Sequence, residues 1–407
     1  MRPPSIMLIA GEASGDTLAA ELVGALRERL VQARAQSGAD VQPLRTALTP
    51  HFFGAGGPKM AAAGVELAFD MTPHAVTGLS EALKGYFKFR QLMRELLQLA
   101  IRRRPDIIIC VDFSGFNRRF AHAVRERVRS ERGLFNNWNP KIVQYVSPQV
   151  WASREGRAQQ MAQDYDLVLS IFPFEKAWYA ARVPRLHVAF VGHPMVGRFS
   201  NTNPAAPNAT AAAAAAPHIV LLPGSRADEV RRHLPLVAET ARRMIQARPA
   251  EFVAIAPNET MAAEVRAALA ALGPACRVQV GGIAEALRTA DLAISKTGTV
   301  LMECAMFGVP AVTFYKTSWP TYLIAKRLIK VKWLTMPNIL ADEAIFPEFV
   351  QQDATPENLA RTALDLLADP ARRAVIQDRL REIVASLGRP GAAQRAARII
   401  TNAWLKT

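Results

Sequence analysis

Residues Ser5 to Asp16 read SIMLIAGEASGD and join a short apolar run to a loop of small residues. The run Ser5–Ala10 is typical of a strand that is buried on both faces of a parallel sheet. A helical pattern begins near Thr17. Small residues at such a junction let backbone N–H groups approach an anion. We therefore expect a strand, a ligand-contacting loop and a helix; a tight turn with Ser14 or Asp16 as the helix N-cap is the alternative.

The same alternation of short apolar runs and longer amphipathic segments continues along the chain. Six expected strands precede residue 200: Ser5–Ala10, His51–Gly54, Asp106–Phe113, Lys141–Val146, Asp166–Phe172 and His187–Val191. Five more follow residue 217: His218–Leu222, Glu251–Ala256, Arg277–Val280, Asp291–Ser295 and Ala311–Tyr315. Strands that alternate with helical patterns predict an α/β protein, here with two parallel sheets.

The two groups of strands are separated by Asn201 to Pro217, which reads NTNPAAPNATAAAAAAP and has no amphipathic pattern. Its prolines and low complexity favour a linker. We expect a first domain over 1–200, the linker over 201–217, a second domain over 218–385 and a helical C-terminal segment over 386–407. Two α/β domains joined in this way predict a ligand cleft between them.

The composition is that of an ordinary globular protein, with 407 residues, 50% hydrophobic and 21% charged. Three dispersed cysteines, Cys110, Cys276 and Cys304, exclude a disulfide framework and indicate a reducing compartment. The net charge of +15 favours nucleic acid, anionic lipid or a phosphorylated substrate as partner. No apolar stretch reaches the roughly 18 residues of a spanning helix. We expect a soluble or peripheral protein.

Two further glycine-rich loops follow expected strands. FGAGGPKM (Phe53–Met60) offers Gly56 and Gly57 to a substrate, and a plain turn is equally consistent with it. LLPGSR, ending at Arg226, offers Gly224 and Ser225. Because a guanidinium is planar and forked, Arg226 suits bidentate recognition of phosphate; a solvated Arg on a turn is the alternative.

SKTGTVLMEC (Ser295–Cys304) is the sharpest local signal. Thr297, Gly298 and Thr299 open a helix whose first N–H groups are placed to hold a diphosphate. Glu303 lies one turn along on the same face. We interpret it as the acceptor for both hydroxyls of a ribose; the alternative is an exposed carboxylate on a capped helix.

Asp112 closes an apolar strand and is the candidate general base, with a capping Asp as the ordinary alternative. Glu12 and Asp16 are the next candidates by topology. The string Asp164-Tyr165-Asp166 precedes its strand, at the edge that open α/β sheets do not use for ligands. We therefore predict no metal site and no cofactor.

Two stretches combine basic and apolar residues: Tyr86–Arg104 (YFKFRQLMRELLQLAIRRR) and Lys316–Trp333 (KTSWPTYLIAKRLIKVKW). For the first we favour a helix packed on the sheet over one in a membrane interface. In the second, core packing explains the Leu and Ile residues but leaves two tryptophans beside the cations. That pattern favours a membrane interface or an amphiphilic, phosphorylated substrate.

Eight motifs occur in one order along nearly the whole chain: GEASGD, FGAGGPKM, YVSPQVWASR, FPFEK, VGHPM, LLPGSR, TGTVLMEC and MPNILAD. This order resembles the lipid-A-disaccharide synthase family of GT-B glycosyltransferases. The resemblance implies two Rossmann-like, doubly wound parallel-sheet domains that face a cleft. It also implies an inverting, metal-independent hexosyltransferase of lipid A biosynthesis. The donor is UDP-2,3-diacylglucosamine and the acceptor 2,3-diacylglucosamine 1-phosphate (lipid X); the products are a β-1,6-linked disaccharide 1-phosphate and UDP.

The resemblance also implies where the partners bind. The first domain takes lipid X, the second takes the UDP-sugar, and the final helix returns to the first domain. Family members act peripherally at the inner face of the bacterial inner membrane, on anionic lipid and without nucleic acid. They can exchange C-terminal parts in a homodimer.

The site residues are carried over position by position. Asp112 matches the functional Asp of the family's D-x-x-x-F-N motif, which ends here at Asn117, and Arg226 would neutralise charge on the UDP leaving group. Asn338 matches a position near the donor. Acceptor contacts are expected from Glu12, Ser14, Gly15, Asp16, Gly56, Gly57, Ser147 and Trp151. Donor contacts are expected from Gly224, Ser225, Thr297, Gly298, Thr299 and Glu303.

Two motifs depart from the family pattern. The second Asp of D-A-P-D-F-N is Gly115 here, and the second Trp of W-A-W-R is Ser153. Two rivals of the same fold use UDP-sugars, a peptidoglycan N-acetylglucosaminyltransferase and a UDP-sugar epimerase; the stretches around Gly11 and Ser147 argue against both. A basic nucleic-acid-binding protein is the rival of another class, and it predicts binding that weakens steeply with salt.

Overall fold

A computed structural model describes residues 3–35, 50–71, 82–199 and 216–405. The chain forms two compact units. Unit 1 comprises Met1–Gly197 and Gly388–Thr407, and unit 2 comprises Arg198–Leu387. Nearly all of the expected linker, 201–217, lies outside the described residues.

Unit 1 contains a seven-stranded sheet in the order β3-β2-β1-β4-β5-β6-β7, with every pair parallel. The strands are β1 (Ser5–Ala10), β2 (His51–Gly56), β3 (Glu66–Asp70), β4 (Ile107–Val111), β5 (Lys141–Tyr145), β6 (Leu167–Ser170) and β7 (Val188–Phe190). The helices are α1 (Ala13–Ala35), α2 (Pro58–Ala62), α3 (Ala82–Arg103), α4 (Ser114–Glu131), α5 (Val150–Ser153), α6 (Arg157–Asp164), α7 (Pro173–Arg182), α8 (Pro194–Arg198) and α17 (Ala392–Leu405).

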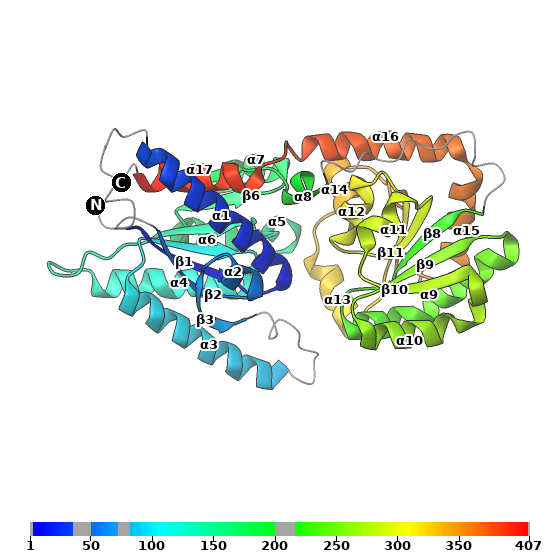
Figure 1. Cartoon of the computed structure of the whole chain (residues 1–407), viewed down its shortest axis with the longest axis horizontal. Helices are drawn as coiled ribbons and strands as arrows, with labels where there is room; N and C mark the ends of the chain where they lie inside the picture. Colours follow the sequence, from blue (N-terminus) through cyan, green and yellow to red (C-terminus); the bar gives the residue numbers. More distant parts are fainter. Residues whose placement is uncertain (1–2, 36–49, 72–81, 200–215, 406–407) are drawn as a thin grey trace. The chain divides into compact units, whose positions relative to one another are not determined.

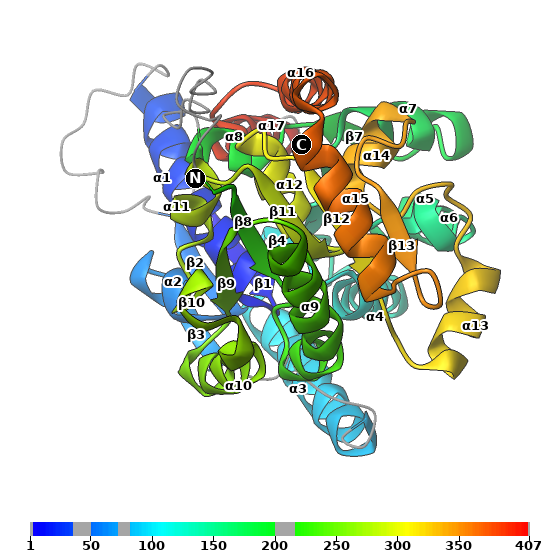
Figure 2. The same ribbon diagram turned by 90° about the vertical axis from the view of Figure 1, so that its right-hand side faces the viewer.

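Unit 2 contains a six-stranded sheet in the order β10-β9-β8-β11-β12-β13, again with parallel pairs. The strands are β8 (His218–Leu222), β9 (Glu251–Ala256), β10 (Cys276–Val280), β11 (Leu292–Lys296), β12 (Ala311–Tyr315) and β13 (Glu348–Val350). The helices are α9 (Ala227–Ala247), α10 (Glu259–Leu269), α11 (Ile283–Arg288), α12 (Val300–Met306), α13 (Trp319–Leu328), α14 (Met336–Ala341), α15 (Pro356–Ala368) and α16 (Pro370–Ser386). Figure 2 shows α15 beside α9 on one face of this sheet.

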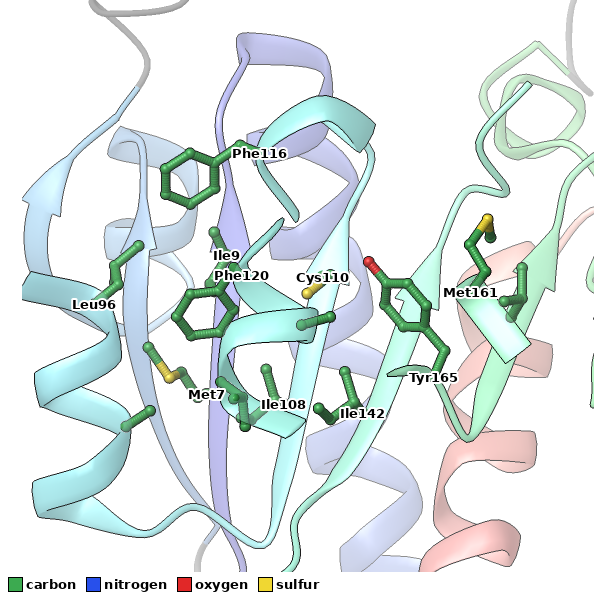
Figure 3. Close-up of a cluster of buried hydrophobic side chains, with 14 of the residues drawn as sticks. Met7, Ile9, Leu96, Ile108, Cys110, Phe116, Phe120, Ile142, Met161 and Tyr165 are labelled. Carbon is green, nitrogen blue, oxygen red and sulfur yellow. The ribbon is translucent and has the colours of Figure 1, made fainter. Parts of the chain in front are cut away.

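The core of unit 1 explains why its central strands are continuously apolar. α1 and α17 pack against each other on one face of the sheet (Figure 1). On the other face, Leu96 of α3 and Phe120 of α4 close over Ile9 and Ile108, and all four are fully buried (Figure 3). Phe116 lies at one end of this cluster. The helix that begins beside Asp112 is therefore anchored by its own apolar face.

The expected α/β class with two parallel sheets is confirmed. Every expected strand is present, with ends within three residues of the observed ones, and β1, β8, β9 and β12 match fully. Two strands were not expected, β3 and β13. Both are edge strands: β3 alternates exposed and half-buried residues, and β13 has three residues. Neither offers the continuous apolar run by which buried strands are recognised.

The two basic, apolar stretches have different environments. In α3, Leu92, Leu96 and Ala100 are buried, so the packing interpretation holds for the described side chains. No residue of α13 is buried. Figure 2 shows α13 apart from the helices that cover the unit 2 sheet. Among the described residues, no helix is both long and apolar enough to cross a membrane.

Candidate active site

The strand order of unit 1 reverses between β1 and β4, and open α/β sheets bind ligands at the carboxyl ends of such strands. The pairing of Ala10 with Val111 brings the two strand ends side by side. Gly11 and Glu12 follow β1, and Asp112 follows β4. The structure thus joins two sequence-predicted segments, about 100 residues apart, in one place.

The backbone at Asp112 is held in an unusual conformation. Asp112 and Phe113 both lie in the left-handed region, with φ of 49° and 43°. The Asp112 carbonyl accepts hydrogen bonds from Asn117 Nδ2 at 2.8 Å and Gln144 Nε2 at 3.1 Å, and its N–H donates to the Tyr145 carbonyl at 2.8 Å. Non-glycine residues in this region are strained and persist where neighbours fix them. Asn117 is fully buried, so its amide positions Asp112 from within the protein.

The charge state of Asp112 is set by its surroundings. Burial and the nearby Glu12 carboxylate raise the pKa of Asp112 above its usual value. A hydrogen bond from the Phe113 N–H opposes this rise but does not cancel it. A general base works best when its pKa approaches the operating pH. This environment therefore fits Asp112 for accepting a proton, and Glu12 contributes as the neighbouring charge.

One glycine in this region is required by close packing. A Cβ on Gly11 would stand 2.2 Å from the Phe113 ring, which no real contact permits. A Cβ on Gly15 would make only ordinary contacts, 3.8 Å from the Cβ of Asp112. Ser14, in the first turn of α1, is exposed. The loop therefore needs glycine for packing against the Asp112 segment.

Asp16 has a structural role that the sequence did not reveal. Its carboxylate accepts hydrogen bonds from the backbone N–H groups of Gly57, Lys59 and Met60 at 2.8 to 3.0 Å, and it is 2% exposed. It therefore caps α2, a different helix from the one expected. A Cβ on Gly56 would meet Met60 Sδ at 2.1 Å. The Gly56–Gly57 loop is thus tied to α1.

Ser147 and Trp151 lie largely inside unit 1, at 4% and 5% exposure. Trp151 Nε1 donates to Glu175 Oε1 at 3.0 Å, and Ser147 Oγ donates to Tyr179 Oη at 3.2 Å. Glu175 is fully buried, and burial raises its pKa to about 7 against the hydrogen bonds from Trp151 and its other donors. Glu175 was not singled out, although it lies in the FPFEK motif.

A cavity of about 460 Å³ is lined by Phe113, the residue that follows Asp112. Phe89, Met93, Phe113 and Phe116 form its apolar wall, and Arg90 and Arg119 supply cations. The rings of Phe113 and Phe116 stack with centroids 5.7 Å apart. An apolar wall with cationic groups suits an amphiphilic, anionic ligand.

Unit 2 has the corresponding site where β8 and β11 meet. A cavity of about 290 Å³ is lined by Gly224, Ser225, Gly298 and Thr299, together with residues after β9 and β10. Lys296, the last residue of β11, also lines it and was not singled out from the sequence. The structure brings together four of the residues expected at the donor.

Glu229 organises the cations at this end of the sheet. Its carboxylate accepts a hydrogen bond from Lys296 Nζ at 3.1 Å and lies 3.6 Å from Arg226 Nη1. Although burial opposes ionisation, Lys296, the Ser225 N–H and Arg226 hold the pKa of Glu229 below its usual value. Arg226 is 54% exposed. One carboxylate thus orients two cations and leaves a net positive charge beside the cavity.

The remaining residues expected at the donor, Thr297, Glu303 and Asn338, differ in their burial and hydrogen bonds. Thr297 follows β11, and its N–H donates to the Phe314 carbonyl at 2.9 Å. Glu303 is half-buried in the seven-residue α12, and burial raises its pKa while Arg198 lowers it. Asn338 is fully buried, and its amide bonds Glu348 Oε1 and both backbone groups of Phe346 at 2.8 Å. It therefore supports the segment before β13 from inside unit 2.

Comparisons with known proteins agree with this arrangement. A family model described as lipid-A-disaccharide synthetase matches residues 6–402. The lipid-A-disaccharide synthase of Myxococcus xanthus is 34% identical over 402 residues, covering 97% of this chain and 96% of its own. That of Anaeromyxobacter dehalogenans (strain 2CP-C) is 36% identical over 395 residues, covering 96% and 95%.

Among solved structures, a putative UDP-N-acetylglucosamine 2-epimerase from Listeria monocytogenes aligns with a TM-score of 0.62 at 14% identity. The alignment covers 100% of this chain and 98% of the other. At that identity the likeness shows the GT-B fold alone. The family match and the two relatives carry the assignment further. The chain therefore belongs to the lipid-A-disaccharide synthase family and is a hexosyltransferase of lipid A synthesis.

Proposed function

We propose that the protein condenses UDP-2,3-diacylglucosamine with 2,3-diacylglucosamine 1-phosphate. The products are the β-1,6-linked disaccharide 1-phosphate and UDP. The observation that carries this proposal is a difference in charge between two places: the carboxyl ends of β1 and β4 in unit 1, and those of β8 and β11 in unit 2. In unit 1, a half-buried carboxylate with a raised pKa lies one residue before Phe113, which lines an apolar cavity. In unit 2, Lys296 lines a glycine-containing pocket, and Arg226 is paired with the same carboxylate as Lys296.

The chemistry follows from these charges. Asp112 accepts the proton of the acceptor 6-hydroxyl, and that oxygen attacks the anomeric carbon of the donor. The bond from this carbon to the UDP oxygen breaks as the new one forms, which inverts the centre. Negative charge then grows on UDP, and Arg226 and Lys296 stabilise it. Unit 1 thus supplies the base that deprotonates the acceptor, and unit 2 supplies the cations that stabilise the leaving group.

The donor contacts in this proposal come from four loop residues and one carboxylate. Gly224, Ser225, Gly298 and Thr299 let the backbone approach the diphosphate. Glu303 accepts the ribose hydroxyls. On the acceptor side, Glu12, Ser14 and Gly15 face the sugar, whereas Asp16, Asn117, Ser147 and Trp151 act by holding the loops that surround it.

We place the membrane contact of this enzyme on α13, at the inner face of the inner membrane. Trp319, Leu323 and Ile324 are 56 to 61% exposed, and Lys326 and Arg327 lie on the same helix. Exposed aromatic and aliphatic side chains with cations suit an anionic bilayer surface. Leu323→Ser with Ile324→Ser should reduce sedimentation with vesicles of phosphatidylglycerol and phosphatidylethanolamine. The same variant should turn over a water-soluble acceptor analogue at the wild-type rate. If the variant and the wild type sediment equally with the vesicles, the membrane contact is not on α13.

We also propose a homodimer that exchanges α17. Within the chain, α17 packs on α1, and Arg395 Nε donates to the Val191 carbonyl at 2.7 Å. Gly388 and Gly391, with φ of 92° and 93°, precede this helix. A second copy offers the same contacts, so exchange costs few of them. Light scattering should give twice the monomer mass, and a monomer at micromolar concentration would contradict exchange.

The test of function is direct. Purified protein is incubated with the UDP-linked donor and radiolabelled acceptor 1-phosphate, in the presence of EDTA, and the label is followed by thin-layer chromatography. We expect a labelled disaccharide 1-phosphate and one UDP per product. UDP-N-acetylglucosamine serves as the control donor and should give none. Transfer from the control donor alone would favour another UDP-sugar enzyme of this fold.

A further inference from the structure

Four arginines from three segments gather near the Asp112 end of unit 1. Arg118 and Arg119 are neighbours on α4, Arg154 directly follows α5, and Arg157 begins α6. The Arg157 N–H donates to the Arg154 carbonyl at 3.0 Å, and α4 packs on α6. We call these four residues the arginine cluster.

The cluster repels itself. Burial lowers the pKa of Arg118, and Arg119 and Arg154 lower it further; burial and the other three arginines lower that of Arg157. Like charges act in this way only at short range. Within the described parts of the chain, no ion pair or side-chain hydrogen bond neutralises any of the four guanidinium groups. The acid that attracts Arg118, Asp164, is already bonded to His122 Nδ1 at 3.2 Å.

The cavity beside Asp112 provides a second, independent observation. Arg119 belongs both to the arginine cluster and to the wall of this cavity of about 460 Å³. The rest of its wall is largely aromatic, with Phe89 6.0 Å from Phe113 between ring centroids. Asp112 directly precedes Phe113. Positive charge and an apolar cavity therefore adjoin one another, and Asp112 lies one residue before the cavity wall.

We propose that the arginine cluster binds the 1-phosphate of the acceptor glycolipid and that the adjoining cavity takes one of its acyl chains. This inference rests on the proposed function and deepens it. Four donors of fork geometry match a phosphomonoester, which carries close to two negative charges and three acceptor oxygens. The phosphate removes the repulsion that the cluster otherwise carries.

The spacing along α4 fits the acceptor. Arg118 lies four residues after the first residue of α4, about 6 Å along the helix axis. That length is comparable to one sugar ring. The carbon that carries the 1-phosphate and the carbon that carries the hydroxymethyl group flank the ring oxygen, so phosphate at the cluster holds the 6-hydroxyl within about one ring's length, in reach of Asp112. Binding of the phosphate thus positions the 6-hydroxyl oxygen near Asp112, its proposed base.

The test compares two acceptors, 2,3-diacylglucosamine 1-phosphate and the same glycolipid without phosphate. Arg119→Gln, Arg154→Gln and the double variant are assayed with each, at saturating donor. We expect kcat/KM for the phosphorylated acceptor to fall about 10- to 100-fold per variant. For the unphosphorylated acceptor it should stay within about twofold, and the donor KM should not change. The preference for phosphate then collapses.

Two controls separate this site from a structural role. Arg129→Gln on the same helix removes an exposed arginine paired with Glu126 and should change neither acceptor. Because the cluster repels itself, Arg119→Gln and Arg154→Gln should keep or raise the melting temperature. An equal loss with both acceptors, or a lower melting temperature with no change of preference, would overturn the proposal.

A bilayer phosphate is the other source of the same chemistry. Sedimentation with phosphatidylglycerol vesicles distinguishes it. If the variants lose vesicle binding and keep the acceptor preference, the cluster binds membrane phosphate and the acceptor assignment is wrong. If the wild type turns over neither acceptor, the proposed function itself fails. That outcome is distinct from active enzyme with an unchanged preference, which overturns the arginine site alone.

Discussion

The carboxyl ends of the two sheets, at the point where each strand order reverses, have the same topology and differ in electrostatics. In unit 1 the carboxylate after the fourth strand, Asp112, is half-buried near another carboxylate, Glu12, and its pKa is raised. In unit 2 the carboxylate Glu229 is paired with Lys296, which lines the pocket, and with Arg226, and the pKa of Glu229 is lowered. One sheet end is thus prepared to take up a proton and the other to hold an anion.

This difference shows how one fold serves two halves of a reaction. Both units use the order 3-2-1-4-5-6 for their first six strands, counted within each sheet. The chemistry resides in the loops that follow the strands, because only there do side chains leave the packed core. Each of the following variants changes one end and leaves the other as its control.

The largest effect is expected for Asp112→Asn. Turnover should fall about 10²- to 10⁴-fold, since a general base contributes that much. UDP binding by unit 2, measured by calorimetry, should be unchanged. In the wild type, kcat should rise with pH through the raised pKa of Asp112.

The same variant makes an opposite prediction for stability. A carboxyl whose pKa is raised by folding stabilises the protein below its unfolded pKa and loses this contribution as pH rises through the folded value. Ionised Asp112 therefore costs stability at pH 7. Asp112→Asn should raise the melting temperature at pH 7 and raise it less at pH 4. A lower melting temperature at pH 7 would contradict the burial of this charge.

The cations of unit 2 should give the next largest effect. Arg226→Ala removes a group that faces the growing charge on UDP, and kcat should fall about 10²- to 10³-fold. Lys296→Met should weaken UDP binding about 10-fold or more, because a charged hydrogen bond is lost. Neither variant should change binding of the acceptor to unit 1. A loss of acceptor binding alone would reverse the assignment of the two ends.

Two glycine substitutions sharpen the contrast. Gly11→Ala places a Cβ 2.2 Å from the Phe113 ring, so unfolding free energy should fall by about 1–3 kcal/mol. Gly298→Ala places its Cβ 3.3 Å from Lys296 Cε, at the end of a flexible side chain. We expect unchanged stability and a raised donor KM. Gly24→Ala in α1, with nothing within 4 Å, should stabilise by about 0.5–1 kcal/mol and serves as the matched control.

The smallest effect is expected for Glu66→Gln, at the amino end of β3. Its hydrogen bond with Arg103 lowers the pKa of Glu66 to about 2. The pair is exposed, so solvent screening should limit its contribution to less than about 1 kcal/mol. This contribution is present above the usual Glu pKa and is lost as pH falls toward 2. Chemical denaturation at pH 7 and pH 3 measures it, and turnover should not change.

The sequence predicted the central strands and many loop residues for a definite reason. β1, β4, β8 and β11 are buried on both faces, so their apolar runs are continuous, and ligands bind where such runs end. The edge strands β3 and β13 lack this signal. Glu175 and Lys296 lie inside motifs that were recognised, but a motif shows which segment matters and does not show which of its side chains is buried or paired.

The roles of single residues depended on contacts across the chain. Asp16 was expected at a substrate and caps a helix more than 40 residues away, because its carboxylate meets three backbone N–H groups there. Asn338 was expected near the donor, and its amide is used within the protein. Residue type shows which hydrogen bonds a side chain can make. Only the folded chain shows which partner lies within hydrogen-bonding distance.

The sequence by itself determined the α/β class, the two sheets, the family and the loops that carry the chemistry, because these follow from local periodicity and motif order. The tertiary structure alone decided which carboxylate is half-buried near a second one, which carboxylate is paired with cations, and that four arginines from three segments of unit 1 meet. Charge interactions depend on distance and burial, and packing brings together residues that are far apart in the sequence.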